Sequence, residues 1–137
     1  MKVIQRQATV LLVEDLLPLQ SLLAHSLESQ HLKVLTAKNG KEALKIAFHE
    51  PCDLVLANVL MPTMTGIELT RALNSHPATY SIPVVFLSVL DREELWKDVR
   101  DLPNVMTCLW KNEMSLSQVV NKVLECLEVQ KKLHQNT

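Results

Sequence analysis

Short apolar runs alternate along this chain with longer stretches in which apolar residues recur every three or four positions. The runs are rich in strand-forming residues, and the stretches between them have the periodicity of a helix with one apolar face. Five runs are predicted to be strands: 9–13, 33–37, 53–57, 82–87 and 105–110. Each run is followed by a predicted helix: 18–27, 42–50, 67–74, 91–100 and 116–127.

Residues at the predicted boundaries support these elements. Pro18 suits the first turn of a helix, where its missing N–H costs nothing, and Pro51 ends the second helix. Ser115 and Gln118 have the spacing of a capping box, in which each side chain bonds the backbone N–H of the other residue. The segment 58–66 holds a proline and two threonines and is predicted to be a loop.

Strict alternation of strands and helices predicts an α/β fold with a parallel sheet and helices on both faces. The run 53–57 is apolar at positions that point to both faces, as expected of a central strand. Right-handed crossovers then favour a doubly wound arrangement. A chain of 137 residues fits one domain, spanning 1–137 with a core at about 9–127. The polar segment 128–137 suits either a helix extension or a tail.

Composition narrows the functional classes. Apolar residues make up 47% of the chain and the net charge is −1, so this domain lacks the basic excess that nucleic-acid binding needs. No uninterrupted apolar stretch reaches the roughly 20 residues that span a bilayer, and the N-terminus has no signal-peptide core, so we expect a cytoplasmic location without a membrane segment. The three cysteines form no CxxC pair and are expected to be free thiols.

Polar residues follow most of the predicted strands. Glu14 and Asp15 follow the first strand, Asn58 the third, Ser88 the fourth and Lys111 the fifth. In an open parallel sheet, ligands bind outside the carboxyl ends of the strands. These five side chains are therefore expected to lie together on one rim.

Several segments, in order, resemble the receiver domains of two-component response regulators, the CheY-like family. The resemblance covers about residues 9–127. It rests on Val13-Glu14-Asp15, on the strand 53–58, on the loop 60–66, on Pro83-Val84-Val85-Phe86-Leu87-Ser88 and on Leu109-Trp110-Lys111. The resemblance implies a flavodoxin-like (βα)5 sheet of five parallel strands in the order 2-1-3-4-5.

The resemblance also implies roles for the rim residues. In the family, an aspartate at the position of Asn58 accepts a phosphoryl group, and two acids with a backbone carbonyl hold Mg²⁺. Glu14 and Asp15 would be those acids, and Leu60 would supply the carbonyl.

Three further family roles fall on the last two strands. Lys111 would pair with the phosphoryl group, and Ser88 would be the switch hydroxyl. Cys108 stands at the position of the aromatic switch residue, where a thiol would alter or remove the coupling between site and surface.

Asn58 departs from the family pattern in a way that decides the chemistry. The lone pair of an amide nitrogen is delocalised, which makes it a poor nucleophile, and the amide oxygen is neutral. We therefore predict no stable phosphorylation at position 58 and a Mg²⁺ site that is weakened or lost. Val89 after Ser88, Thr65 in the loop and Asn112 after Lys111 depart from the family as well.

Two explanations of Asn58 remain open. A pseudo-receiver accounts for the several departures together. An ordinary receiver whose acceptor aspartate was replaced explains Asn58 but leaves Val89, Cys108 and Asn112 unexplained. Slow deamidation of Asn58 is disfavoured because Val59 hinders it.

Enzymatic classes are disfavoured. A small phosphatase of the haloacid type needs an aspartate nucleophile and a second acid two residues later, and Asn58-Val59-Leu60 provides neither. Two glycines cannot build a phosphate-cradling loop of the flavodoxin type. The sequence predicts a signalling module rather than an enzyme.

The resemblance implies a protein partner: a histidine kinase, a phosphotransfer protein or an output domain. Trp110 precedes Lys111 on the last strand and points to the opposite face. We hypothesise a homodimer through the face formed by the last two helices and the strand between them, near Trp110. The alternative is that Trp110 packs beneath one of those helices.

Overall fold

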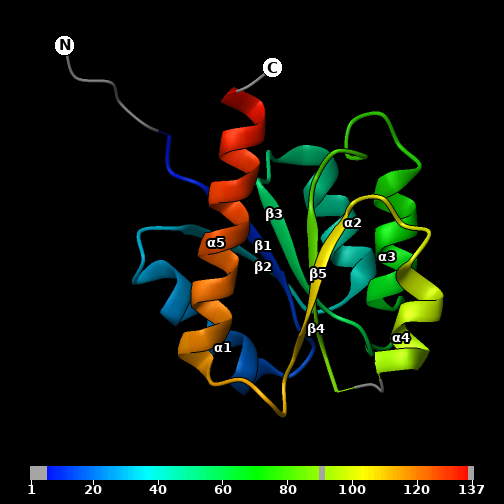
Figure 1. The fold of residues 1–137 in the computed structure, drawn as a ribbon, viewed down its shortest axis with the longest axis horizontal. Coiled ribbons are helices and arrows are strands. Elements are labelled where there is room, and N and C mark those ends of the chain that lie inside the picture. The colour runs from blue at the N-terminus through cyan, green and yellow to red at the C-terminus, as the bar shows by residue number, and fades with distance from the viewer. Residues whose placement is uncertain (1–5, 90–91, 136–137) are drawn as a thin grey trace.

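A computed structural model describes residues 6–89 and 92–135 and shows a five-stranded sheet between two layers of helices (Figure 1). The strands pair in the order β2-β1-β3-β4-β5, and all are parallel, which confirms the predicted topology. The strands are β1 Thr9–Val13, β2 Lys33–Ala37, β3 Leu54–Asn58, β4 Val84–Ser88 and β5 Val105–Trp110. The helices are α1 Leu17–Glu28, α2 Gly40–His49, α3 Gly66–Asn74, α4 Arg92–Val99 and α5 Leu116–Gln135.

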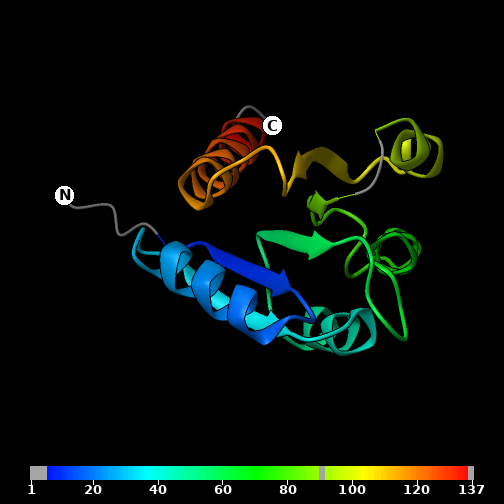
Figure 2. The same cartoon turned by 90° about the horizontal axis from the view of Figure 1, so that it is seen from below.

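Helices cover both faces of the sheet. Figure 2 shows α1 and α5 on one side and α2, α3 and α4 on the other. The three inner strands β1, β3 and β4 are buried along their whole length, because both of their faces are covered. Apolar side chains alternate between the two layers, so that Leu12, Leu56 and Val85 pack with α1 and α5 whereas Leu11, Val55 and Phe86 belong to the opposite core.

Several element boundaries differ from the prediction by one or more residues. β3 begins and ends one residue later, so Asn58 is its last residue rather than the first residue of a loop. β4 begins at Val84, because Pro83 has no N–H to give to the ladder and contributes only its carbonyl, which accepts from Val55 N. α5 continues as a helix to Gln135, so the polar segment after residue 127 extends the last helix. Position 91, the predicted start of the fourth helix, lies outside the described residues.

One helix cap agrees with the sequence prediction, and a second cap was not predicted. Ser115 and Gln118 form the predicted capping box at the start of α5. Thr65 forms a second box with Glu68 at the start of α3, which explains the hydroxyl at this loop position without any role in binding. None of the helices in the described part of the chain is long and apolar enough to cross a membrane.

The three cysteines are free thiols in the structure. Cys126 is buried, whereas Cys52 and Cys108 are half-buried. Burial raises the pKa of the Cys52 thiol to about 11, with the nearby carboxylates of Glu50 and Asp53 adding to the effect. The Cys52 thiol is therefore protonated at neutral pH.

Candidate functional site

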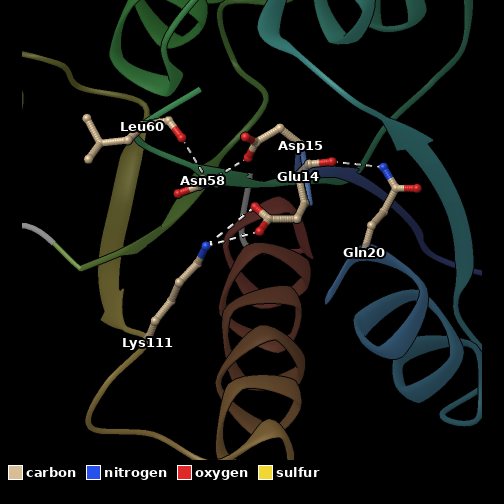
Figure 3. Close-up of polar contacts among 6 residues, drawn as sticks. All are labelled: Glu14, Asp15, Gln20, Asn58, Leu60 and Lys111. Atoms are coloured by element: carbon tan, nitrogen blue, oxygen red, sulfur yellow. Dashed lines mark hydrogen bonds and ion pairs between the residues drawn. The ribbon is translucent and has the colours of Figure 1, made fainter. Parts of the chain in front are cut away.

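The carboxyl ends of β1, β3 and β5 bring most of the sequence-predicted residues together (Figure 3). Glu14 and Asp15 follow β1, Asn58 ends β3, and Lys111 follows β5. Asn58 donates to Asp15, and Lys111 pairs with Glu14, so the four side chains lie together at one rim. Ser88 ends β4, and its buried backbone carbonyl accepts from Lys111 N at 3.0 Å.

Glu14 is fully buried and is paired with Lys111. The Lys111 Nζ lies 3.1 Å from Glu14 Oε1 and 3.4 Å from Oε2. Burial nevertheless raises the pKa of the Glu14 carboxyl above its ordinary value, although the Lys111 ammonium opposes that effect. The pair therefore holds a carboxylate that burial disfavours, and Lys111, helped by a hydrogen bond from Asn58, opposes that effect.

The Asn58 amide bridges two acceptors. Its Nδ2 donates to Asp15 Oδ1 at 3.1 Å and to the Leu60 carbonyl at 2.9 Å. A carboxylate and a backbone carbonyl both accept hydrogen bonds, so the nitrogen and not the oxygen of the amide faces them. Both N–H groups of Asn58 are thus used within the rim.

Backbone contacts fix where Asn58 and Leu60 lie. Val59 N donates to Leu87 O, which extends the pairing of β3 with β4 past the end of the strand. Gly66 N donates to Val59 O at 2.9 Å, so the loop returns to the strand end from which it left. The start of α3 thereby closes the rim loop against β3.

Gln20 is a rim residue that the sequence analysis missed. Its Nε2 donates to Glu14 O at 3.0 Å and to Ala37 O at 3.1 Å (Figure 3). These bonds tie α1 to the carboxyl ends of β1 and β2. A glutamine on the first turns of a helix gives no signal of this role, because only the packing of α1 beside both strands creates it.

The rim residues do not fit a Mg²⁺ ion as they lie. Mg²⁺ needs oxygen ligands, whereas the amide of Asn58 turns its nitrogen toward Asp15 and Leu60. Glu14 is buried and paired with Lys111. Within residues 6–89 and 92–135, no three His, Cys, Asp or Glu side chains form a group that could hold a metal.

Cys108 and Trp110 lie on the face of β5 that points to α2, α3 and α4. Trp110 is half-buried, and the Arg92 guanidinium lies 4.7 Å from the centre of its ring. Arg92 also pairs with Glu113. Trp110 therefore packs beneath the first turn of α4, in agreement with the packing alternative, and burial raises the pKa of Cys108 nearby.

The raised pKa of Glu14 predicts a pH-dependent contribution to stability. A carboxyl whose pKa is raised by folding favours the folded state below the ordinary pKa of 4.5, and this contribution is lost as the pH rises through the raised pKa. The stability of the native protein minus that of Glu14→Gln should therefore fall as the pH rises above 4.5. Urea unfolding of both proteins over a series of pH values measures the difference, and a difference that grows with pH would contradict the assignment.

Comparison with protein families gives one match that covers most of the chain. A family model described as the response regulator receiver domain matches residues 10–123. Protein PilH of Pseudomonas aeruginosa is 30% identical over 119 residues, which cover 85% of this chain and 98% of PilH. A probable cyclic di-GMP phosphodiesterase of Vibrio cholerae is 37% identical over 82 residues, or 60% of this chain. The matched segment is only 18% of that relative's length.

Solved structures agree with the sequence comparisons. The chemotaxis response regulator CheY4 of Vibrio cholerae superposes with a TM-score of 0.79 at 25% identity, covering 89% of this chain and 99% of that one.

Proposed function

Because this chain belongs to the response regulator receiver domain family, we propose that it is a receiver that is not phosphorylated at position 58 and that signals through protein contacts. The observation that carries the proposal is the hydrogen bonding of the Asn58 side chain. The family's acceptor position holds an amide whose two N–H groups are bound to Asp15 and Leu60. A group of this kind has neither the charge nor the free lone pair of a nucleophile.

The rest of the rim supports the same proposal. Lys111, which in the family pairs with the phosphoryl group, is bound to the buried Glu14 carboxylate. Among the described residues, Asp15 and Glu14 supply the negative charge of the rim, and Lys111 pairs with Glu14. These internal contacts among the described residues support a rim that works without a phosphoryl group.

Phosphorylation of the native chain and of Asn58→Asp tests the proposal. After incubation with acetyl phosphate and Mg²⁺, we expect no added phosphoryl mass on the native chain and a phosphoryl adduct on Asn58→Asp. The reason is that the substitution restores a carboxylate nucleophile beside Asp15 and Lys111. Intact-protein mass spectrometry measures both, and a phosphoryl adduct on a rim residue of the native chain would overturn the proposal.

A matched control for that experiment is Asn121→Asp. Asn121 is exposed on α5 and makes no contact with the rim residues named above, and the substitution adds the same carboxylate there. We expect no phosphoryl adduct on this variant.

The switch position separates the two explanations of Asn58. An ordinary receiver that had lost only its acceptor would show a phosphorylation-dependent change at β5 once the aspartate is restored. Cys108 lacks the aromatic ring that such a switch uses, so we expect no such change in Asn58→Asp.

We infer that the face of α4 and β5 is the surface through which two copies of this chain associate. The face carries a groove of about 500 Å³, and both tryptophans of the chain line it with Arg92 and Arg100. Trp96 is 64% exposed. Of the described residues that line this groove, none is acidic, whereas α4 itself carries the exposed acids Glu93, Glu94 and Asp98.

That charge arrangement supports a symmetric pair. In a twofold dimer each surface meets a copy of itself, so the acids of one α4 can face the arginines of the other. Exposed tryptophan and arginine side chains are the residues that contribute most to such interfaces. A histidine kinase, a phosphotransfer protein or an output domain would compete for the same face.

Sedimentation of the native chain and of Trp96→Ser tests the dimer. We expect the native chain to sediment as a dimer and Trp96→Ser as a monomer, because the exposed indole is lost without disturbing a buried side chain. Tyr80→Ser is the control, since Tyr80 is a similarly exposed aromatic residue that does not line this groove. A native chain that remains monomeric at high concentration would exclude this interface.

A further inference from the structure

We propose that the Asn58 amide takes the place of a divalent cation at this rim and holds the strand ends in one arrangement that neither needs nor binds Mg²⁺. The inference deepens the proposed function, since it explains how a receiver without a phosphoryl group keeps its rim ordered. It rests on four contacts: Asn58 with Asp15, Asn58 with Leu60, and Lys111 with each oxygen of Glu14.

The amide nitrogen lies where two acceptors converge. Asp15 Oδ1 is 3.1 Å away and the Leu60 carbonyl oxygen 2.9 Å away from Nδ2. Without a donor between them, a carboxylate and a carbonyl would face each other with like partial charge. The two N–H groups offset that repulsion, which is the structural role that a cation between the same two oxygens would have.

The same nitrogen excludes a cation. A Mg²⁺ ion bound to Asp15 and Leu60 would need both oxygens at about 2.0–2.1 Å, in the region toward which the N–H hydrogens of Asn58 point. Those hydrogens carry partial positive charge and repel the ion. Asn58 is only 8% exposed, so its amide is largely shielded from solvent that could replace Asp15 and Leu60 as acceptors.

Lys111 completes the replacement. A neutral amide contributes no net charge, and the rim still holds two carboxylates. Lys111 compensates the fully buried one, Glu14, at 3.1 Å, while Asp15 is half-buried and reaches solvent. The Lys111–Glu14 pair therefore links the end of β5 to the end of β1. The bond from Asn58 to Asp15 links the end of β3 to the same end of β1.

Calorimetric titration with MgCl₂ and thermal unfolding, with and without MgCl₂ at constant ionic strength, test the proposal. We expect no binding heat and no Mg²⁺-dependent change in Tm for the native chain. Asn58→Asp should bind Mg²⁺ at least about tenfold more tightly than the native chain, because affinity for hard cations follows the number of carboxylate ligands. Its Tm should be lower than that of the native chain without Mg²⁺ and should rise when Mg²⁺ is added.

Two further measurements keep the outcome decisive. Asn58→Ala removes the donors without adding charge, and its Tm should fall below that of the native chain. In the native chain, the Asn58 side-chain amide protons should exchange with solvent more slowly than those of the exposed Asn121. Asn121→Asp should leave the Mg²⁺ response unchanged.

Failure of this inference differs from failure of the proposed function. Mg²⁺ binding by the native chain, or an Asn58→Ala variant as stable as the native chain, would overturn the replacement of the cation by the amide. Either result could occur in a chain that acetyl phosphate does not modify. Phosphoryl mass on the native chain would overturn the proposed function instead.

Discussion

Lys111→Met is expected to lower the free energy of unfolding by about 3 kcal/mol at neutral pH, because removing one partner of a buried pair leaves the other charge uncompensated. The Glu14 carboxylate is fully buried, and both of its oxygens lie within 3.4 Å of Lys111 Nζ. Methionine keeps most of the length of the lysine side chain, so the loss reports charge more than packing.

The size of this loss should depend on pH. Burial already raises the pKa of Glu14, and without Lys111 the carboxyl would take up a proton at a still higher pH. Protonation limits the cost, so Lys111→Met should be less destabilising at acidic pH than at neutral pH. Urea unfolding at both pH values measures this difference.

A control variant and a double variant accompany Lys111→Met. Lys41→Met changes an exposed lysine on α2 and should alter stability by no more than about 0.5 kcal/mol. Glu14→Gln combined with Lys111→Met removes both charges and should recover part of the loss. If Lys111→Met is no less stable than Lys41→Met, the pair does not hold the rim as described.

Gly66→Ala is expected to destabilise the protein by about 2–3 kcal/mol through overpacking at the end of β3. An added Cβ at Gly66 would lie 2.4 Å from the Asn58 carbonyl oxygen and 3.1 Å from Val59 Cα. Both are backbone atoms, which cannot move aside as the end of a flexible side chain can. The first turn of α3 must therefore move away from β3 or displace Asn58.

The same substitution should disturb the rim. Movement of the Asn58 backbone shifts its amide from Asp15 and Leu60, so the side-chain amide resonances of Asn58 should change in NMR spectra of Gly66→Ala. Ser117→Ala, at an exposed position in the first turn of α5, is the control and should leave stability and these resonances nearly unchanged. A Gly66→Ala variant as stable as the native chain would show that α3 does not press on β3.

The sequence by itself determined the elements of this fold and their order. Strands and helices follow from local periodicity, and strict alternation leads to a parallel sheet covered on both faces. The strand-end positions of Glu14, Asp15 and Lys111 were also predictable, because the end of an apolar run is visible in the sequence. β4 begins two residues later than predicted, because Pro83 has no N–H to donate to the neighbouring strand. This effect depends on the pairing of strands, which local pattern does not show.

Only the tertiary structure decided how the rim residues are used. Lys111 and Glu14 are 97 positions apart, and their pairing needs β5 and β1 to end at the same edge. The direction of the Asn58 amide depends on where the loop places the Leu60 carbonyl, and Gln20 joins the rim only because α1 packs beside β1 and β2. Local pattern predicts which groups arrive at the rim, whereas the distances among groups from different strands decide which of them bind one another.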